Sequence, residues 1–253
     1  MTILNILASI LLFAYIGFHL VAYARLCLKG GKRAHERSES EGGSALLGKF
    51  FMEMGLWAID RYVSWLVGRK IRPTSLSLMS LGWGLLAGLS FAVESFGFAA
   101  WFILLSGMFD IFDGAVARRL DLESPRGAVI DSILDRYVEF FAFAGLLIYY
   151  RDYWVIQLIC LTAFCGSFMI TYSTAKAEAL RIKPPRGFMK RAERLVYMLV
   201  AAALSPISIY WFEEPVGGRP ALAVPMLVAL GIIAVFSHIS ALVRMFALAK
   251  KAA

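Results

Sequence analysis

The chain has 253 residues, of which 60% are hydrophobic and only 17% are charged. This composition excludes an ordinary water-soluble domain, because apolar runs of nearly twenty residues match the thickness of a lipid bilayer. The net charge of +8 does not indicate a nucleic-acid partner, because most Lys and Arg residues lie between apolar segments and at the C-terminus, a pattern typical of contact with anionic membrane lipids.

The first element is an apolar segment at residues 3–24, which is long enough to cross a membrane. Basic residues from Arg25 to Arg33 follow it and none precedes it, so we expect its N-terminus outside and its basic flank in the cytoplasm. A cleaved signal peptide is the alternative, because Ala22 to Ala24 resemble a cleavage site. The segment lacks a basic start and exceeds the usual signal-peptide core, which favours an uncut helix at residues 1–28.

Residues 29–72 are expected to form a cytoplasmic linker and an interfacial helix. Residues 30–44 are rich in charge, Gly and Ser, as is typical of a polar linker. Residues 45–70 place aromatic side chains at helical spacing, but charged residues interrupt them too often for a membrane span. This pattern predicts an amphipathic helix in the membrane interface. A soluble helix packed on the membrane domain is the alternative.

Residues 73–253 are expected to form a transmembrane domain of six helices. The fold class is therefore an all-α integral membrane protein: a six-helix bundle, an extra N-terminal transmembrane helix and the interfacial amphipathic helix. The fifth span contains Pro206, where we expect a kink. The six predicted spans are residues 73–93, 96–118, 127–150, 153–176, 194–212 and 220–248.

The distribution of charge predicts the orientation of these spans. The turns on one side hold two basic residues, Arg151 and Arg219. The two loops on the other side hold ten: Arg118, Arg119, Arg126, Lys176, Arg181, Lys183, Arg186, Lys190, Arg191 and Arg194. The positive-inside rule places these loops in the cytoplasm. We expect a multi-pass protein of the cell inner membrane.

Two pairs of carboxylates lie on the cytoplasmic side, Asp110 with Asp113 and Asp131 with Asp135. Spacings of three and four residues put each pair on one face of a helix. Four carboxylates at the edge of an apolar bundle repel one another unless cations neutralise them. Oxygen ligands suit Mg²⁺, Mn²⁺ or Ca²⁺ rather than zinc, so the sequence predicts a divalent-metal site at the membrane surface.

This stretch resembles the signature of the CDP-alcohol phosphotransferase (CDP-alcohol phosphatidyltransferase) family, D-x2-D-G-x2-A-R-x8-G-x3-D-x3-D. The resemblance extends over the membrane domain from about residue 73 and does not cover the first seventy residues. All eight fixed positions are filled at the right spacing, by Asp110, Asp113, Gly114, Ala117, Arg118, Gly127, Asp131 and Asp135.

The resemblance implies a metal-dependent enzyme of phospholipid biosynthesis. A polar alcohol attacks the lipid-side phosphorus of a CDP-linked lipid such as CDP-diacylglycerol, and CMP is released. Two divalent cations, Mg²⁺ or Mn²⁺, are implied, with Asp110, Asp113 and Asp131 as ligands. Asp135 is implied to be the general base for the acceptor hydroxyl and also to contact a metal. A homodimer is a further implication.

By the same resemblance, Gly114, Ala117, Arg118 and Gly127 line the pocket for the CDP-linked lipid. Arg118 is always charged and its planar fork fits phosphate. The alternative is that Arg118 only extends toward the membrane surface and that the glycines only allow close helix packing.

Two segments are similar to the sequence pattern of the phosphatidylinositol phosphate synthase-like branch of this family: T-Y-S-T-A-K-A-E and, after it, G-F-M-K-R-A-E-R. That branch reads roughly S-Y-x-K/R-A-R-A-E and then G-x3-R-x2-R. The similarity implies that Lys176, Arg191 and Arg194 bind the phosphate of an acceptor such as inositol phosphate or another phosphorylated polyol. Thr174 stands where the pattern has a basic residue. Glycerol phosphate and an unphosphorylated alcohol therefore remain alternative acceptors, and charge anchoring at the membrane remains the alternative role for the three cations.

Two other classes use acidic residues within membranes. An intramembrane prenyltransferase would distribute its motifs over separate halves of a larger bundle, whereas here both pairs lie within 26 residues. An ion-coupled transporter would carry ionisable groups near the middle of the membrane, whereas these lie at one surface. The pattern favours the phosphatidyltransferase.

Overall fold

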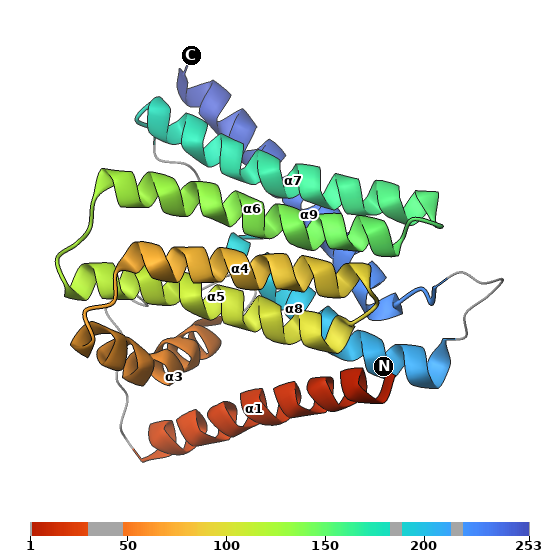
Figure 1. Cartoon of the computed structure of the whole chain (residues 1–253). Helices are drawn as coiled ribbons and strands as arrows, with labels where there is room; N and C mark the ends of the chain where they lie inside the picture. Colours follow the sequence, from red (N-terminus) through yellow and green to blue (C-terminus); the bar gives the residue numbers. More distant parts are fainter. Residues whose placement is uncertain (1, 30–47, 183–188, 214–219, 253) are drawn as a thin grey trace.

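The computed structural model describes residues 2–29, 48–182, 189–213 and 220–252, and within these ranges the regular secondary structure is entirely helical (Figure 1). The all-α prediction is confirmed. The linker predicted at residues 30–44 lies outside the described residues. The helices are α1 (Thr2–Leu28), α3 (Gly48–Gly68), α4 (Pro73–Ala92), α5 (Phe96–Arg119), α6 (Pro125–Tyr149), α7 (Trp154–Ala179), α8 (Arg191–Phe212) and α9 (Val224–Ala252).

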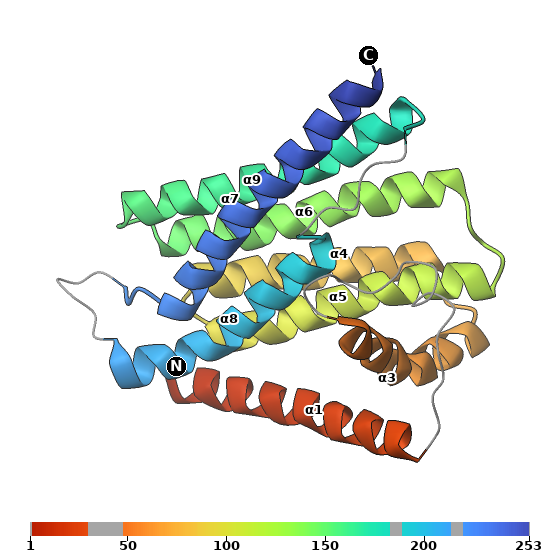
Figure 2. The same cartoon turned by 180° about the vertical axis from the view of Figure 1, so that it is seen from behind.

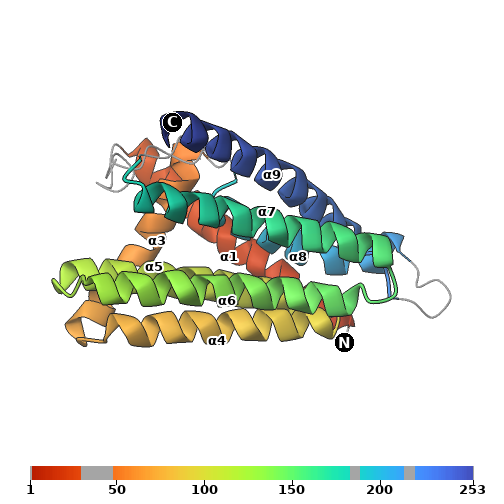
Figure 3. The same ribbon diagram turned by 90° about the horizontal axis from the view of Figure 1, so that it is seen from above.

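Six of the described helices, α1, α4, α5, α7, α8 and α9, are long and apolar enough to cross a membrane. The chain is therefore a multi-pass membrane protein. The remaining predicted span corresponds to α6, which is long enough at 25 residues. It is less apolar because residues 125–139 carry two aspartates, two arginines and a glutamate. α6 lies alongside α4 in the same bundle (Figure 3), so its place in the fold agrees with the prediction although its composition alone does not identify a span.

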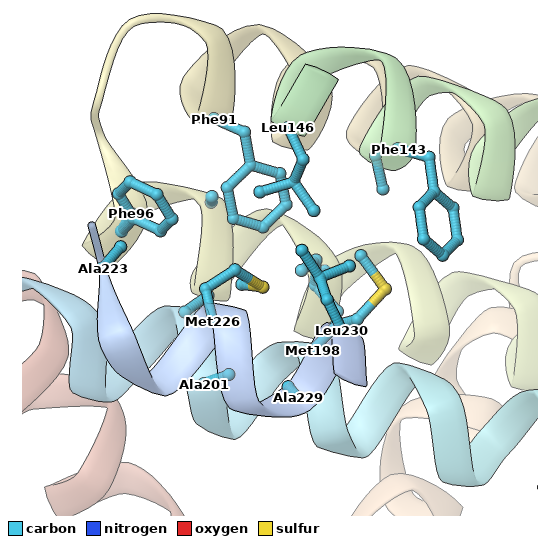
Figure 4. Packing of buried hydrophobic residues seen from close by; sticks show 14 of the residues in the cluster. Phe91, Phe96, Phe143, Leu146, Met198, Ala201, Ala223, Met226, Ala229 and Leu230 are labelled. Atoms are coloured by element: carbon cyan, nitrogen blue, oxygen red, sulfur yellow. The ribbon is translucent and has the colours of Figure 1, made fainter. Parts of the chain in front are cut away.

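The core of the bundle lies where α4, α5, α6, α8 and α9 meet. Figure 4 shows Phe91, Leu146 and Leu230 pointing toward one another from three of these helices, and all three are fully buried. Small residues on α8 and α9, such as Ala201 and Ala229, fill the narrow space between those two helices. Large side chains on one helix and small ones on the next allow this dense packing.

Glycines set the distance between α4 and α6. A Cβ atom on Gly145 would overlap the backbone of Gly88, and a Cβ on Gly88 would overlap the backbone of Phe141. Close approach of helix backbones through small residues is a common way for membrane helices to associate. It keeps α6, which carries the second carboxylate pair, in a fixed register with α4.

α1 packs against α5 and α8 (Figure 2). The Oδ1 atom of Asn5 accepts a hydrogen bond of 3.2 Å from the backbone N–H of Gly97, in the first turn of α5. The indole N–H of Trp101 donates to the carbonyl oxygen of Ala8 at 2.9 Å. Since the N–H groups in the first turn of a helix have no partner within the helix, α1 supplies one of the missing partners to α5.

α3 packs against the other end of α5 (Figure 1). Ile59 and Val63 are buried against a cluster that includes Phe112 of α5. Arg119 of α5 forms an ion pair with Asp60 and donates to the hydroxyl of Ser64 at 2.9 Å. Two aromatic side chains of α3, Tyr62 and Trp65, are about half exposed. α3 is thus a helix with one face packed on the bundle.

Candidate active site

The two carboxylate pairs meet because α5 ends and α6 begins at the same end of the bundle (Figure 1). The short connection is stabilised at Ser124, whose side chain caps α6 by accepting a hydrogen bond of 3.1 Å from the N–H of Gly127. Pro125 follows in the first turn, where a missing N–H costs nothing. This local geometry reverses the chain, so that α6 runs back along α4.

Three of the four predicted metal ligands form a compact group. Asp110, Asp131 and Asp135 each offer a carboxylate oxygen, and these oxygens lie within 4.8 Å of one another. Two oxygens on opposite sides of one cation lie roughly 4–5 Å apart, twice the metal–oxygen distance of Mg²⁺ or Ca²⁺. The donor set therefore fits a hard divalent cation.

The fourth predicted ligand, Asp113, is held slightly apart. Its side chain is 5% exposed, and its Oδ2 atom accepts a hydrogen bond of 2.6 Å from the hydroxyl of Ser77 in α4. One carboxylate oxygen of Asp113 is thus used for positioning. Ser77 was not identified from the sequence, where a serine near the start of an apolar helix carries no signal.

Arg191, in the first turn of α8, contacts the carboxylates directly. One terminal nitrogen lies 2.8 Å from Oδ1 of Asp110, and the other lies 2.7 Å from Oδ1 of Asp135. The side chain is 19% exposed. A residue predicted to bind the acceptor therefore bridges two predicted metal ligands on different helices.

Arg194, one turn further along α8, is engaged differently. Its Nε atom donates to Glu139 at 2.9 Å, a terminal nitrogen forms an ion pair with the same oxygen at 2.8 Å, and the other donates to the carbonyl oxygen of Met189 at 2.8 Å. Arg136 pairs with the second oxygen of Glu139 at 3.0 Å. Arg194 is only 2% exposed, so it joins α8 to α6 and to the residues before α8.

The remaining predicted site residues lie on α5, α6 and α7. Gly114 faces the guanidinium of Arg118, which would lie 3.3 Å from a Cβ at position 114, so a glycine leaves room for this arginine. Arg118 and Gly127 are exposed, and Ala117 is partly buried. Lys176 is exposed in the last turn of α7.

Arg244 of α9 is a second residue that the sequence reasoning missed. It is 8% exposed, and it donates a hydrogen bond of 2.7 Å to the hydroxyl of Thr174. Its Nε atom has no hydrogen-bond partner among the described residues. The available signal was an arginine within an apolar helix, which is expensive to bury and therefore usually functional.

A small cavity extends from this site into the bundle. It lies between α4, α5, α6 and α8, with Ile103, Val138 and Met198 on its apolar side and Glu139, Arg191 and Arg194 on its charged side. The site thus combines clustered carboxylates, several buried arginines and an apolar wall. Such an arrangement can hold cations and phosphate groups beside a lipid.

Comparison with known proteins agrees with this chemistry. The model of the CDP-alcohol phosphatidyltransferase family matches residues 70–249. A phosphatidylinositol phosphate synthase of Streptomyces avermitilis is 27% identical over 217 residues, which cover 83% of this chain and 86% of that protein. The matched family region includes both carboxylate pairs and excludes α1 and α3.

The fold is similar to that of phosphatidylinositol phosphate synthase of Mycobacterium tuberculosis. The structure of that protein with CDP-DAG bound has a TM-score of 0.63 and 25% identity, covering 74% of this chain and 90% of that chain. Its structure in complex with manganese and citrate has the same TM-score and identity, covering 74% of this chain and 86% of that chain.

Proposed function

The chain belongs to the CDP-alcohol phosphatidyltransferase family, and on that premise we propose that it transfers a phosphatidyl group from CDP-diacylglycerol to inositol phosphate, releasing CMP. The observation that carries the choice of acceptor is Arg244. Thr174 replaces a basic residue of the phosphatidylinositol phosphate synthase pattern, and Arg244 brings a guanidinium to the Thr174 hydroxyl. The charge that is missing from α7 is therefore supplied by α9.

The acceptor phosphate would bind among Lys176, Arg191 and Arg244. The partnerless Nε atom of Arg244 favours an anionic ligand, because a buried cationic group without a partner is costly. Arg194 would not contact the phosphate, since its nitrogens already contact Glu139 and the carbonyl oxygen of Met189. It fixes the first turn of α8, from which Arg191 reaches the carboxylates.

Asp110, Asp113, Asp131 and Asp135 would hold two divalent cations, Mg²⁺ or Mn²⁺. When bound, these cations neutralise the pyrophosphate oxygens and stabilise the charge that develops as the phosphoanhydride bond breaks. Asp135 would accept the proton of the attacking hydroxyl. Since a carboxylate beside cations is a weak base, this step requires a hydroxyl that is already polarised.

The CDP moiety would lie over the end of α5 and the start of α6, against Gly114, Ala117, Arg118 and Gly127. Arg118 is exposed and its fork can bind phosphate in a bidentate manner. The lipid chains would pass between the exposed apolar side chains of the bundle. Residues 73–253 would form this catalytic unit, preceded by the helix at 1–28 and the segment at 29–72.

The charge asymmetry supports an orientation in which the site faces the cytoplasm, in a cell inner membrane. A homodimer is proposed from the family resemblance alone. Light scattering of the purified protein in detergent measures the oligomeric state, and proteolysis of inside-out and right-side-out vesicles measures the orientation.

The reaction is tested by CMP release from purified protein with CDP-diacylglycerol and Mg²⁺ or Mn²⁺. Inositol phosphate, glycerol phosphate, inositol, glycerol and serine are offered in parallel. We expect CMP and a phosphorylated lipid product with inositol phosphate. Asp131→Asn should abolish this release. Asp121→Asn should not, because Asp121 is exposed in the loop after α5 with a φ of 53°, a conformation that asparagine adopts readily.

Two results would count against this proposal. Faster CMP release with inositol or glycerol than with any phosphorylated acceptor would refute the assignment of the acceptor. Absence of CMP release with every acceptor, from protein shown to be folded and loaded with metal, would refute the reaction. An intramembrane prenyltransferase and an ion-coupled transporter, the other interpretations of the acidic motif, do not fit the family match over residues 70–249.

A further inference from the structure

We propose that Arg191 is an exchangeable counter-ion of the carboxylate group: a divalent cation displaces it from Asp110 and Asp135, and the displaced guanidinium then binds the acceptor phosphate. This inference rests on the proposed function and deepens it. It makes binding of metal and binding of acceptor interdependent, so that the cationic side of the acceptor pocket forms only after metal has bound.

The first step is the position of the guanidinium. Its two terminal nitrogens lie 2.8 Å and 2.7 Å from the Oδ1 atoms of Asp110 and Asp135. The contact with Asp110 is a charge-assisted hydrogen bond, and the contact with Asp135 is an ion pair without hydrogen-bond geometry. The planar fork of Arg191 thus joins α5 and α6 across the middle of the acidic group.

The second step is competition for the same oxygens. Asp110 and Asp135 are two of the three residues whose carboxylate oxygens come within 4.8 Å of one another. A cation bound there draws on the oxygens that Arg191 now contacts. It also places a double positive charge next to the guanidinium, and like charges at this separation repel strongly where little water screens them.

The third step is the balance of charge. Fully ionised, Asp110, Asp113, Asp131 and Asp135 carry four negative charges, which two divalent cations neutralise. Arg191 is then a surplus cation on a side chain that is only 19% exposed. A largely buried charge without a partner is unfavourable, and a phosphate dianion in the adjacent pocket is the ligand that would relieve it.

The fourth step is the difference between Arg191 and Arg194. Arg194 is 2% exposed and is held by Glu139 and by the carbonyl oxygen of Met189. Its contacts involve none of the predicted metal ligands, so metal binding leaves them intact. The first turn of α8 therefore stays in place while the side chain of Arg191 moves, which makes Arg191 the mobile member of the pair.

The test is a titration of the purified protein with Mn²⁺ by isothermal calorimetry, with and without inositol phosphate. In the wild type, inositol phosphate should tighten Mn²⁺ binding by roughly tenfold, within the range usual for coupled sites. By reciprocity Mn²⁺ should tighten inositol phosphate binding by the same factor. Without inositol phosphate, Arg191→Gln should bind Mn²⁺ more tightly than the wild type, because the competing guanidinium is gone, and the coupling should disappear.

Two further variants serve as controls. Arg191→Lys keeps the charge but lacks the planar fork that places one nitrogen on each carboxylate, so its Mn²⁺ affinity and coupling should be intermediate. This variant also serves if Arg191→Gln does not fold. Lys176→Gln removes a pocket cation on the exposed end of α7. It should weaken inositol phosphate binding while leaving Mn²⁺ affinity and the coupling factor unchanged.

The outcomes separate this inference from the proposed function. Equal Mn²⁺ affinity in the wild type and Arg191→Gln would overturn the proposed role of Arg191 and leave the proposed reaction standing. Coupling that persists in Arg191→Gln would do the same, because the metal would then contact the acceptor phosphate directly. Wild-type protein whose Mn²⁺ binding is absent, or is unaffected by Asp131→Asn, would overturn this inference and the metal-dependent reaction together.

Discussion

Replacing Arg244 with methionine tests whether α9 contributes to the acceptor pocket. Arg244 is 8% exposed and donates to Thr174 at 2.7 Å, and its Nε atom has no partner among the described residues. One hydrogen bond between charged groups contributes about 1.5–3 kcal/mol. At 1.4 kcal/mol per factor of ten, loss of one such bond to phosphate should raise the KM for inositol phosphate by roughly 10- to 100-fold.

The assay is CMP release with inositol phosphate and CDP-diacylglycerol varied in turn. The KM for CDP-diacylglycerol should change little, because Arg244 contacts α7 rather than the ends of α5 and α6. Arg244→Lys should recover part of the affinity. Lys250→Gln, which removes an exposed cation from the same helix, should leave both KM values unchanged. An unchanged KM for inositol phosphate in Arg244→Met, or an equal rise for both substrates, would refute the reasoning.

Three further variants test the contacts that hold the bundle together. Asn5→Ala removes the acceptor for the N–H of Gly97 and should cost about 1 kcal/mol, lowering the melting temperature by roughly 2–4 °C in a thermal denaturation scan. Gly145→Ala forces α4 and α6 apart, since its Cβ has no room, and should lower the melting temperature further. Arg119→Asp and Asp60→Arg should each lower it slightly, because this ion pair is 38% and 42% exposed and such pairs contribute under about 1 kcal/mol; the double variant should restore it.

Each of these variants has a matched control. Thr2→Ala, on the exposed side of the same helix as Asn5, should leave the melting temperature unchanged. Gly107→Ala should be tolerated, because nothing lies within 4 Å of its Cβ position. Equal melting temperatures for a variant and the wild type would argue against the corresponding contact, and failure of the double charge swap to recover stability would argue against the ion pair.

Most of the fold could be predicted because membrane spans depend on length and hydropathy, which are local properties. The predicted ends of the helices were less accurate where charged residues occur. The fifth span was predicted to begin at Arg194, whereas α8 begins at Arg191. A basic residue before an apolar run is usually predicted to lie in a loop. Arg191 forms ion pairs with carboxylates on two other helices, and these contacts stabilise it as the first residue of α8.

The family could be predicted because the eight-position signature lies within one continuous stretch of chain, and the match of the family model confirms that prediction. The structure brings together Asp110, Asp131 and Asp135, as their spacing indicated. The contacts of Ser77, Arg191 and Arg244 could not be predicted in this way. Asp110 and Arg191 are 81 residues apart, and Thr174 and Arg244 are 70 apart, so nothing in the local pattern relates them. Only the packing of α8 and α9 against the other helices decides which cation reaches which partner.

The same packing explains how α5 tolerates its carboxylates. Asp110 and Asp113 face Asp131 and Asp135 across two adjacent helix ends, and their mutual repulsion acts to separate α5 from α6 when cations are not bound. Arg191 opposes this directly by bridging the two helices. α1 and α3, which lie outside the family match, oppose it indirectly, because one completes the first turn of α5 and the other binds its last turn. Since catalytic ligands must be held to within about 0.5 Å, a helix fixed at both ends by an added segment would keep its carboxylates in place during the proposed exchange of Arg191 for metal.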